Sequence, residues 1–334
     1  MRLSMLTLLL LSALCGAALM ALAFGARSVP LSQVWAALVT PDPGDPAHLT
    51  VTAIRLPRLW AALIAGAGLG MAGVLMQAVT RNPLAEPGLL GVSAGAGFAV
   101  VAGSFLWRLG DPALLALLAF PGAALASIAV FMLGGGGQVT QGGTSPARLA
   151  LAGVAINALL VSAISGMVLT RNETLELYRF WVVGALSGAG ERPLALMGGI
   201  VAAAGAGALL TAGRFDLLAM GDDAARGLGA HPGAVRAIAL LLVTALCGAA
   251  VVVAGPVAFV GLAVAHLARF LAGPGVRGCV WLALFLGPVL LMLADTAGRL
   301  VIAPEELRLG TMAGLLGGPL FVLIVRRLRP GAWA

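Results

Sequence analysis

The chain has 334 residues, of which 60% are hydrophobic and only 10% are charged. Soluble domains carry about 25% charged residues, so this composition excludes an ordinary soluble fold and indicates an integral membrane protein. The net charge is +7, and the basic residues are arginines, most of them standing singly at the ends of apolar runs. Contact with lipid headgroups explains such arginines, and nucleic-acid binding is not predicted.

A membrane-spanning helix needs about 20 residues, so the chain has room for about ten spans. We therefore predict a single transmembrane domain, residues 1–334, with loops too short for a second folded domain. The predicted spans lie at residues 1–25, 57–78, 89–107, 113–133, 146–169, 194–212, 237–254, 256–270, 280–298 and 309–325.

The segments between these spans are predicted in chain order as follows. Residues 1–25 are expected to be a retained first span, because the apolar core of a signal peptide is shorter. Residues 27–54 form a polar loop with one short interfacial helix, and residues 134–143 form a flexible glycine-rich loop. Residues 171–193 are expected to lie in the interface, and residues 214–236 to form two short helices.

The residues that the chain lacks also bear on its function. A P-loop places a lysine on the nucleotide phosphates, and the sequence contains no lysine. The chain is therefore not predicted to be an enzyme, and ATP with its Mg²⁺ would be bound by another polypeptide. Three cysteines, Cys15, Cys247 and Cys279, lie in apolar runs without the spacing of metal ligands, so neither a disulfide framework nor a metal site is predicted.

The stretch from Arg55 to Gly97 carries the most specific pattern in the chain. It opens with Arg-Leu-Pro-Arg, passes through a Gly/Ala-rich run to Asn-Pro-Leu-Ala-Glu-Pro at Asn82, and continues with Leu-Leu-Gly-Val-Ser-Ala-Gly-Ala. This order resembles the permease family of bacterial ABC importers for ferric siderophores, haem and cobalamin. Gly-Pro-Val-Ala-Phe-Val-Gly-Leu at Gly255 and Gly-Gly-Pro-Leu-Phe ending at Phe321 extend the resemblance over most of the chain.

The resemblance implies an all-α integral membrane protein of about ten transmembrane helices with the architecture of a type II ABC importer permease. It also implies a homodimer in the bacterial inner membrane, two ATP-binding subunits inside and a periplasmic substrate-binding protein outside. Both termini are then expected in the cytoplasm, an orientation that the arginine distribution supports only weakly.

The cargo that the resemblance implies is an iron chelate, either haem or a ferric siderophore, moved from the periplasm to the cytoplasm. A cobalamin importer remains an alternative. A secondary transporter coupled to an ion gradient is the alternative from another class. It would require inverted repeats and carboxylates near the bilayer midplane, and we find no convincing example of either in the sequence.

Three arginines, Arg55, Arg58 and Arg299, are candidates for docking the substrate-binding protein, because the resemblance places their motifs on the periplasmic side. Guanidinium groups bind carboxylates through two parallel hydrogen bonds and stay charged at any pH. The alternative is structural: Arg299 pairs with Asp295 in its own helix, and the other two anchor to headgroups.

The resemblance places a loop that couples to the ATPase within residues 214–236. Its motif residues here are Gly221, Asp222, Asp223, Ala224, Arg226, Leu228 and Gly229. Gly221 interrupts the segment, and the two aspartates stand at a plausible helix start. An ordinary amphipathic connector is the alternative.

A cytoplasmic gate is predicted at two polar turns. Asn82 and Leu84 follow the second span, and Thr144 and Ser145 precede the fifth. Capping of free helix ends is an equally good explanation of these residues. Elsewhere the chain departs from the family pattern, with Ala265 and Arg308 where prolines are usual, and Ala265 should leave its span straighter.

Overall fold

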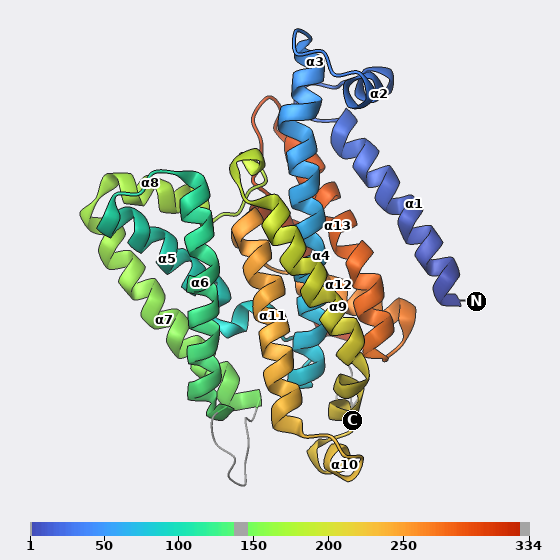
Figure 1. The fold of residues 1–334 in the computed structure, drawn as a ribbon, viewed down its shortest axis with the longest axis vertical. Coiled ribbons are helices and arrows are strands. Elements are labelled where there is room, and N and C mark those ends of the chain that lie inside the picture. Colours follow the sequence, from blue (N-terminus) through green and yellow to red (C-terminus); the bar gives the residue numbers. More distant parts are fainter. Residues whose placement is uncertain (1, 137–145, 328–334) are drawn as a thin grey trace.

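The computed structural model describes residues 2–136 and 146–327, and its regular structure in this part of the chain is helical (Figure 1). The elements are α1 (Arg2–Ala23), α2 (Leu31–Val39), α3 (Pro46–Leu49), η1 (Thr50–Arg55), α4 (Leu56–Thr80), η2 (Pro87–Leu90), α5 (Val92–Trp107), α6 (Pro112–Phe131), η3 (Met132–Gly136), α7 (Pro146–Thr170), α8 (Asn172–Trp181), η4 (Ala189–Glu191), α9 (Leu194–Ala219), α10 (Asp222–Gly227), α11 (Pro232–Ala254), α12 (Val260–Ala272), α13 (Val276–Val301) and α14 (Leu309–Arg327).

The prediction of about ten spans agrees with the number of apolar helices among the described residues. Within the described residues, seven helices are long and apolar enough to cross a membrane. Three shorter apolar helices, Val92–Trp107, Val260–Ala272 and Leu309–Leu323, occupy the remaining predicted places. The expectation of an all-helical membrane protein is therefore confirmed. Of the predicted glycine-rich loop, residues 137–143 lie outside the described part of the chain.

The second span begins earlier than predicted. Helical structure runs without a break from Pro46 to Thr80, so the polar loop expected at residues 27–54 ends at Asp45. The side chain of Asp45 accepts a hydrogen bond from the Ala47 amide at 2.7 Å, and a proline follows at the first helical position. Both features favour a helix start. The prediction placed the start at residue 57 because it relied on the hydrophobic run, which begins after these residues.

The prediction of two short helices within residues 214–236 was wrong. Helix α9 continues to Ala219 and α11 already starts at Pro232, which leaves α10 as the one short helix between them. One charged residue of this segment, Asp216 in α9, has a structural partner: it accepts a hydrogen bond from the backbone amide of Val276 at 2.8 Å and so caps the start of α13.

Helix α4 lies at the centre of the molecule, between α9, α11, α12 and α13 (Figure 1). Its closest approach to α13 is at two glycines. A Cβ atom added to Gly66 would lie 2.6 Å from the Gly287 carbonyl oxygen, and one added to Gly287 would lie 2.0 Å from the Gly66 carbonyl oxygen. The two backbones therefore touch, which small residues permit between membrane helices.

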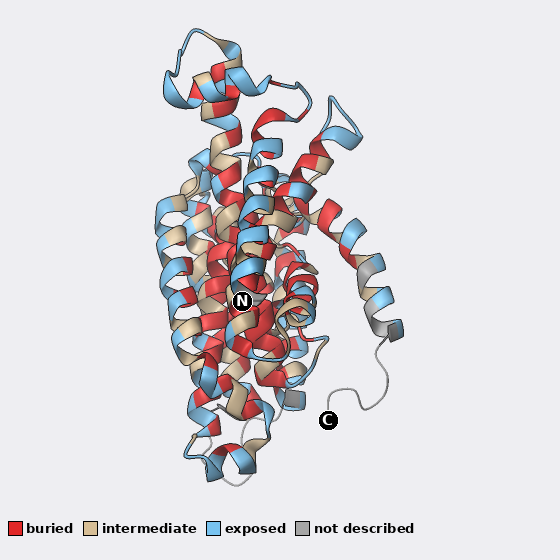
Figure 2. Ribbon diagram, turned by 90° about the vertical axis from the view of Figure 1, so that its right-hand side faces the viewer, coloured by how far each residue is buried: buried red, intermediate tan, exposed pale blue. Residues whose placement is uncertain are grey.

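The contact between α4 and α12 is built in the same way. A Cβ atom at Gly73 would lie 2.2 Å from the Gly261 carbonyl oxygen. Successive glycines thus let the backbone of α4 meet two different neighbours, and the burial pattern follows from this. Buried residues gather in the interior of the molecule, while exposed residues mark the outer faces of the peripheral helices (Figure 2).

Replacing Gly66 by alanine should destabilise the folded protein by about 1–3 kcal/mol, because the added methyl overlaps the backbone of α13. The matched control is Gly199→Ala in α9, where nothing lies within 4 Å of the added atom. That change should be neutral or slightly stabilising. Thermal unfolding of both purified variants checks the comparison, and equal midpoints would contradict the proposed backbone contact.

Candidate functional sites at the two ends of the bundle

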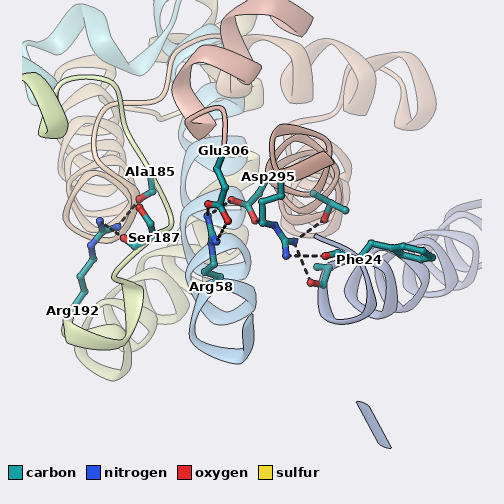
Figure 3. A network of polar contacts seen from close by, with 10 residues as sticks. Phe24, Arg58, Ala185, Ser187, Arg192, Asp295 and Glu306 are labelled. Carbon is teal, nitrogen blue, oxygen red and sulfur yellow. Dashed lines mark hydrogen bonds and ion pairs between the residues drawn. The ribbon is translucent and has the colours of Figure 1, made fainter. Parts of the chain in front are cut away.

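The predicted site residues gather at opposite ends of the bundle, which we call the α3 end and the α10 end (Figure 1). At the α3 end lies a cluster of five charged side chains from three segments. This arginine cluster consists of Arg55, Arg58, Asp295, Arg299 and Glu306. Figure 3 shows Arg58 between Asp295 and Glu306.

Arg58 is held between two carboxylates. Its guanidinium donates two hydrogen bonds to Glu306, at 3.1 and 2.6 Å, in the bidentate geometry of a strong ion pair. Its Nη2 also lies 3.5 Å from Asp295. The hydrogen bonds from Arg58 outweigh partial burial, and they hold the pKa of the Glu306 carboxyl below its ordinary value. Glu306 therefore remains a carboxylate over the neutral and mildly acidic range.

Arg299 and Arg55 donate hydrogen bonds to backbone carbonyls at the C-terminal end of α1. Arg299 donates to the carbonyls of Phe24 at 2.9 Å and Ala21 at 3.1 Å, and its Nε lies 3.0 Å from Asp295. Arg55 donates to the carbonyl of Leu22 at 2.5 Å. The last carbonyls of a helix have no partner within it, so these two guanidiniums satisfy the final turn of α1 and the residue that follows it.

The three arginines predicted to dock a partner therefore differ in their surroundings. Arg55 is 5% exposed and Arg299 is 3% exposed, and both donate to backbone carbonyls. Arg58 is partly exposed, and its bidentate partner Glu306 lies at the surface. Docking of a partner by any of the three stays a prediction. The sequence reasoning missed Glu306, although an acidic side chain in a loop at the arginine-bearing end was an available signal.

At the α10 end, one aspartate joins three segments. Asp222, the first residue of α10, accepts a hydrogen bond from Arg236 of α11 at 2.8 Å and another from Arg81, which follows α4. Arg236 is buried and Asp222 is partly exposed. Neither arginine was among the predicted site residues, since the bond from Arg81 to Asp222 spans 141 residues of sequence.

The charge state of Asp222 follows from these partners. Partial burial alone would raise the pKa of its carboxyl, but the hydrogen bonds and charges of Arg236 and Arg81 outweigh burial and lower the pKa. A carboxyl whose pKa is lowered on folding stabilises the folded state at pH values above its ordinary pKa. That contribution is lost only as the pH falls through the lowered value, so the link persists at neutral pH.

The other predicted coupling residues lie on the exposed side of this loop. Asp223 is fully exposed and, among the described residues, pairs only with Arg226 of the same helix, at 2.7 Å. Leu228 is exposed as well. Gly221 has φ 104° and Gly229 has φ 80°, conformations that glycine adopts without strain, so these two residues set the bends on either side of α10. Ala224 also lies on the exposed face.

The predicted gate residues are described only in part. Asn82 turns the chain after α4: its side chain accepts a hydrogen bond from the Leu84 amide at 2.9 Å, as in a side-chain-stabilised turn. Leu84 is exposed at the same end of the molecule. Thr144 and Ser145 lie outside the described residues. A gating role for these four residues stays a prediction, and the hydrogen bond of Asn82 agrees with its capping alternative.

The turn after α4 also reaches the interior of the bundle. The carboxylate of Glu86 accepts a hydrogen bond from the Phe259 amide at 2.5 Å, immediately before α12. Helix α12 then runs through Ala265, and the expected straightness of this span stays a prediction. Residues 81–86 therefore contact α10 at one side, through Arg81, and α12 at the other, through Glu86.

Replacing Asp295 by asparagine should destabilise the protein by about 3–5 kcal/mol, because it leaves buried arginines without their counter-charge. The comparison variant is Glu306→Gln, which removes a carboxylate that is 37% exposed and should cost less than about 1 kcal/mol. Thermal unfolding of the two variants measures the difference. A Glu306 variant as unstable as the Asp295 variant would contradict the assignment of the buried pair to Asp295.

Comparison with known proteins identifies the family. The family model described as the FecCD transport family matches residues 7–327. The ferric enterobactin permease FepD of Escherichia coli is 41% identical over 93% of this chain and 92% of its own length. The iron(3+)-hydroxamate permease FhuB of Bacillus subtilis is 38% identical over 95% and 82%. The hemin permease HmuU of Yersinia pestis is 37% identical over 83% of both chains.

A solved structure extends the comparison to the fold. A metal-chelate type ABC transporter in an inward-facing conformation superposes with a TM-score of 0.82, covering 98% of this chain and all of that chain at 23% identity. The expected permease architecture is thereby confirmed. The chain belongs to the FecCD transport family, and it is a membrane permease of an ABC importer that does not itself act as an ATPase.

Proposed function

We propose that this permease imports an iron chelate, a ferric siderophore or haem, from the periplasm to the cytoplasm. One observation carries the proposal. The chain is similar to permeases whose names specify ferric enterobactin, iron hydroxamate and hemin, and the similarity covers most of its own length and of theirs. These cargoes share chelated iron. Membership in this family also favours an ATP-driven importer over the ion-coupled alternative, and these three relatives favour iron over cobalamin.

The orientation proposed for the chain puts the α10 end in the cytoplasm and the α3 end in the periplasm, with both termini in the cytoplasm. Two ATP-binding subunits would then meet α10. Its exposed residues support this role, because Met220 and Leu228 flank the short helix and both are more than half exposed. A short helix with apolar flanks fits a groove on a partner chain.

The bonds around α10 supply a route by which its movement would reach the pathway. Asp222 ties α10 to α11 through Arg236, and to the turn after α4 through Arg81. Glu86 in that same turn contacts the start of α12. These contacts are contiguous, so displacement of α10 by an ATPase subunit would act on three helices at once.

The substrate-binding protein would dock at the α3 end. Arg58 is the arginine best placed to meet a carboxylate from outside, because it already binds a surface carboxylate in bidentate geometry. Arg55 and Arg299 support the site from within, through the end of α1. In this proposal the docked partner meets a preformed surface that the buried ion pairs hold in place.

A second copy of the chain would pack against α7. The exposed face of this helix carries apolar side chains such as Leu151 and Val154, but also Asn157 midway along it. An amide exposed to lipid at that depth is unfavourable. A homodimer with α7 beside the axis places Asn157 against protein or the aqueous pathway instead, which supports the predicted dimer.

The proposed cargo is tested by deleting the gene and measuring radioactive iron uptake from a ferric siderophore, from haemin and, separately, labelled cobalamin uptake. Loss of uptake from one iron source, restored by the intact gene, is the expected result. Normal uptake of both iron sources together with loss of cobalamin uptake would overturn the iron assignment.

The role of α10 yields a second prediction. Asp222→Asn should lower transport about tenfold or more, because it weakens the link from α10 to Arg81 and Arg236. Asp223→Asn removes the same charge one residue away and should leave transport within about twofold, because the Asp223 side chain pairs with Arg226 of its own helix. Cargo uptake by proteoliposomes containing the whole transporter, normalised to its ATPase rate, separates the two variants. Equal effects would show that the link through Asp222 is not used.

A further inference from the structure

A pocket of about 460 Å³ opens near the α3 end, between the start of α6, helix α8 and the end of α11. Its volume lies in the range of small-ligand sites, about 300–1,000 Å³. The charged side chains that line it are Arg192 and Arg308, and no acidic residue is among the described residues of its lining. Two aromatic residues, Phe180 and Trp181, also belong to the lining.

Arg308 contributes a positive charge to the pocket, and its planar guanidinium stacks on an aromatic ring. Its guanidinium lies over the ring of Phe180, 4.5 Å from the ring centroid, and Nη1 donates to the Phe180 carbonyl at 2.8 Å. Because a guanidinium has five N–H donors, this single bond leaves donors for a bound anion. Phe180 is 59% exposed, so the part of its ring that Arg308 does not cover is open to a bound ligand.

Arg192 lines the same pocket and is held by backbone carbonyls. Its guanidinium donates to the carbonyls of Ala185 at 2.7 Å and Ser187 at 3.0 Å (Figure 3), and also to that of Val253. The amide of Ala185 in turn donates to the Ala254 carbonyl at 2.8 Å. The loop that borders the pocket is therefore tied to the end of α11, and the second positive charge is held at a fixed place beside it.

We propose that this pocket receives a negatively charged aromatic group of the transported chelate. Two guanidiniums favour an anion, because no carboxylate is among the described residues of the lining. The exposed ring of Phe180 favours a flat aromatic partner. Ferric tris-catecholates and haem share this chemistry, whereas an uncharged ferric hydroxamate does not. The inference rests on the proposed function, since it specifies the class of iron chelate that the permease accepts.

The test is equilibrium binding of radioactive iron chelates to the purified permease–ATPase complex without the substrate-binding protein. A ferric tris-catecholate, haemin and an uncharged ferric hydroxamate are compared. At least one of the two anionic aromatic chelates should bind the wild type, and Arg308→Gln should weaken that binding about tenfold, the loss of roughly one charge-assisted contact. Which of the two chelates binds identifies the source of the aromatic anion.

Two further variants separate the effect of charge at the pocket from the effect of the aromatic ring. Arg179→Gln removes the same charge from the exposed side of α8, outside the pocket, and should leave binding unchanged. Phe180→Leu keeps both guanidiniums but removes the stacking ring, and should weaken binding by about threefold to tenfold. If Arg308→Gln does not assemble with its ATPase, Arg308→Lys and Phe180→Leu carry the comparison.

Several results would overturn the inference. They are failure of both anionic chelates to bind the wild type, equal binding by Arg308→Gln, or equally tight binding of the uncharged hydroxamate. A loss of affinity for the substrate-binding protein in Arg308→Gln, with chelate binding unchanged, would identify a docking surface instead. If the gene proves dispensable for all iron uptake, the proposed function fails independently of this binding experiment.

Discussion

Close contact between helix backbones is the constraint on which the rest of this structure depends. Lipid provides no hydrophobic drive for helices to associate, so membrane helices are held by packing and by polar contacts. Here α4 meets α13 through Gly66 and Gly287, and α12 through Gly73 and Gly261. A side chain at any of these glycines would separate the helices, and with them the polar groups that α4 positions at its two ends.

The polar groups at those ends differ in how firmly they are held. At the α3 end, Arg58 belongs to a network that includes the buried Asp295. At the α10 end, Arg81 stands just beyond α4 and binds the partly exposed Asp222. The first network joins helices that pack closely, whereas the second joins the core to a short exposed helix. The structure therefore combines a rigid end with an end whose outer element has few contacts of its own.

Much of this could be predicted from the sequence, because hydrophobic length and motif order are local properties. The ten apolar helices and the family followed from runs of residues such as Arg55 to Gly97. The burial of Arg299 could not be predicted, since its acceptors in α1 and just beyond it lie more than 270 residues away in sequence. For the same reason the bond between Arg81 and Asp222 was missed. The predicted spans begin later than the helices that start at Pro46 and Pro232, because the first turns of these helices contain polar residues.

The way α1 ends has a consequence for the order in which the chain can assemble during synthesis. The carbonyl of Ala21 in its last turn, and that of Phe24 just beyond, accept hydrogen bonds from Arg299, which is translated 275 residues after Phe24. Until α13 has entered the bilayer, those carbonyls must rely on water or headgroups at the membrane surface. Helix α1 can therefore be locked in place only after α13 has been synthesised and inserted, although the two helices are far apart in the sequence.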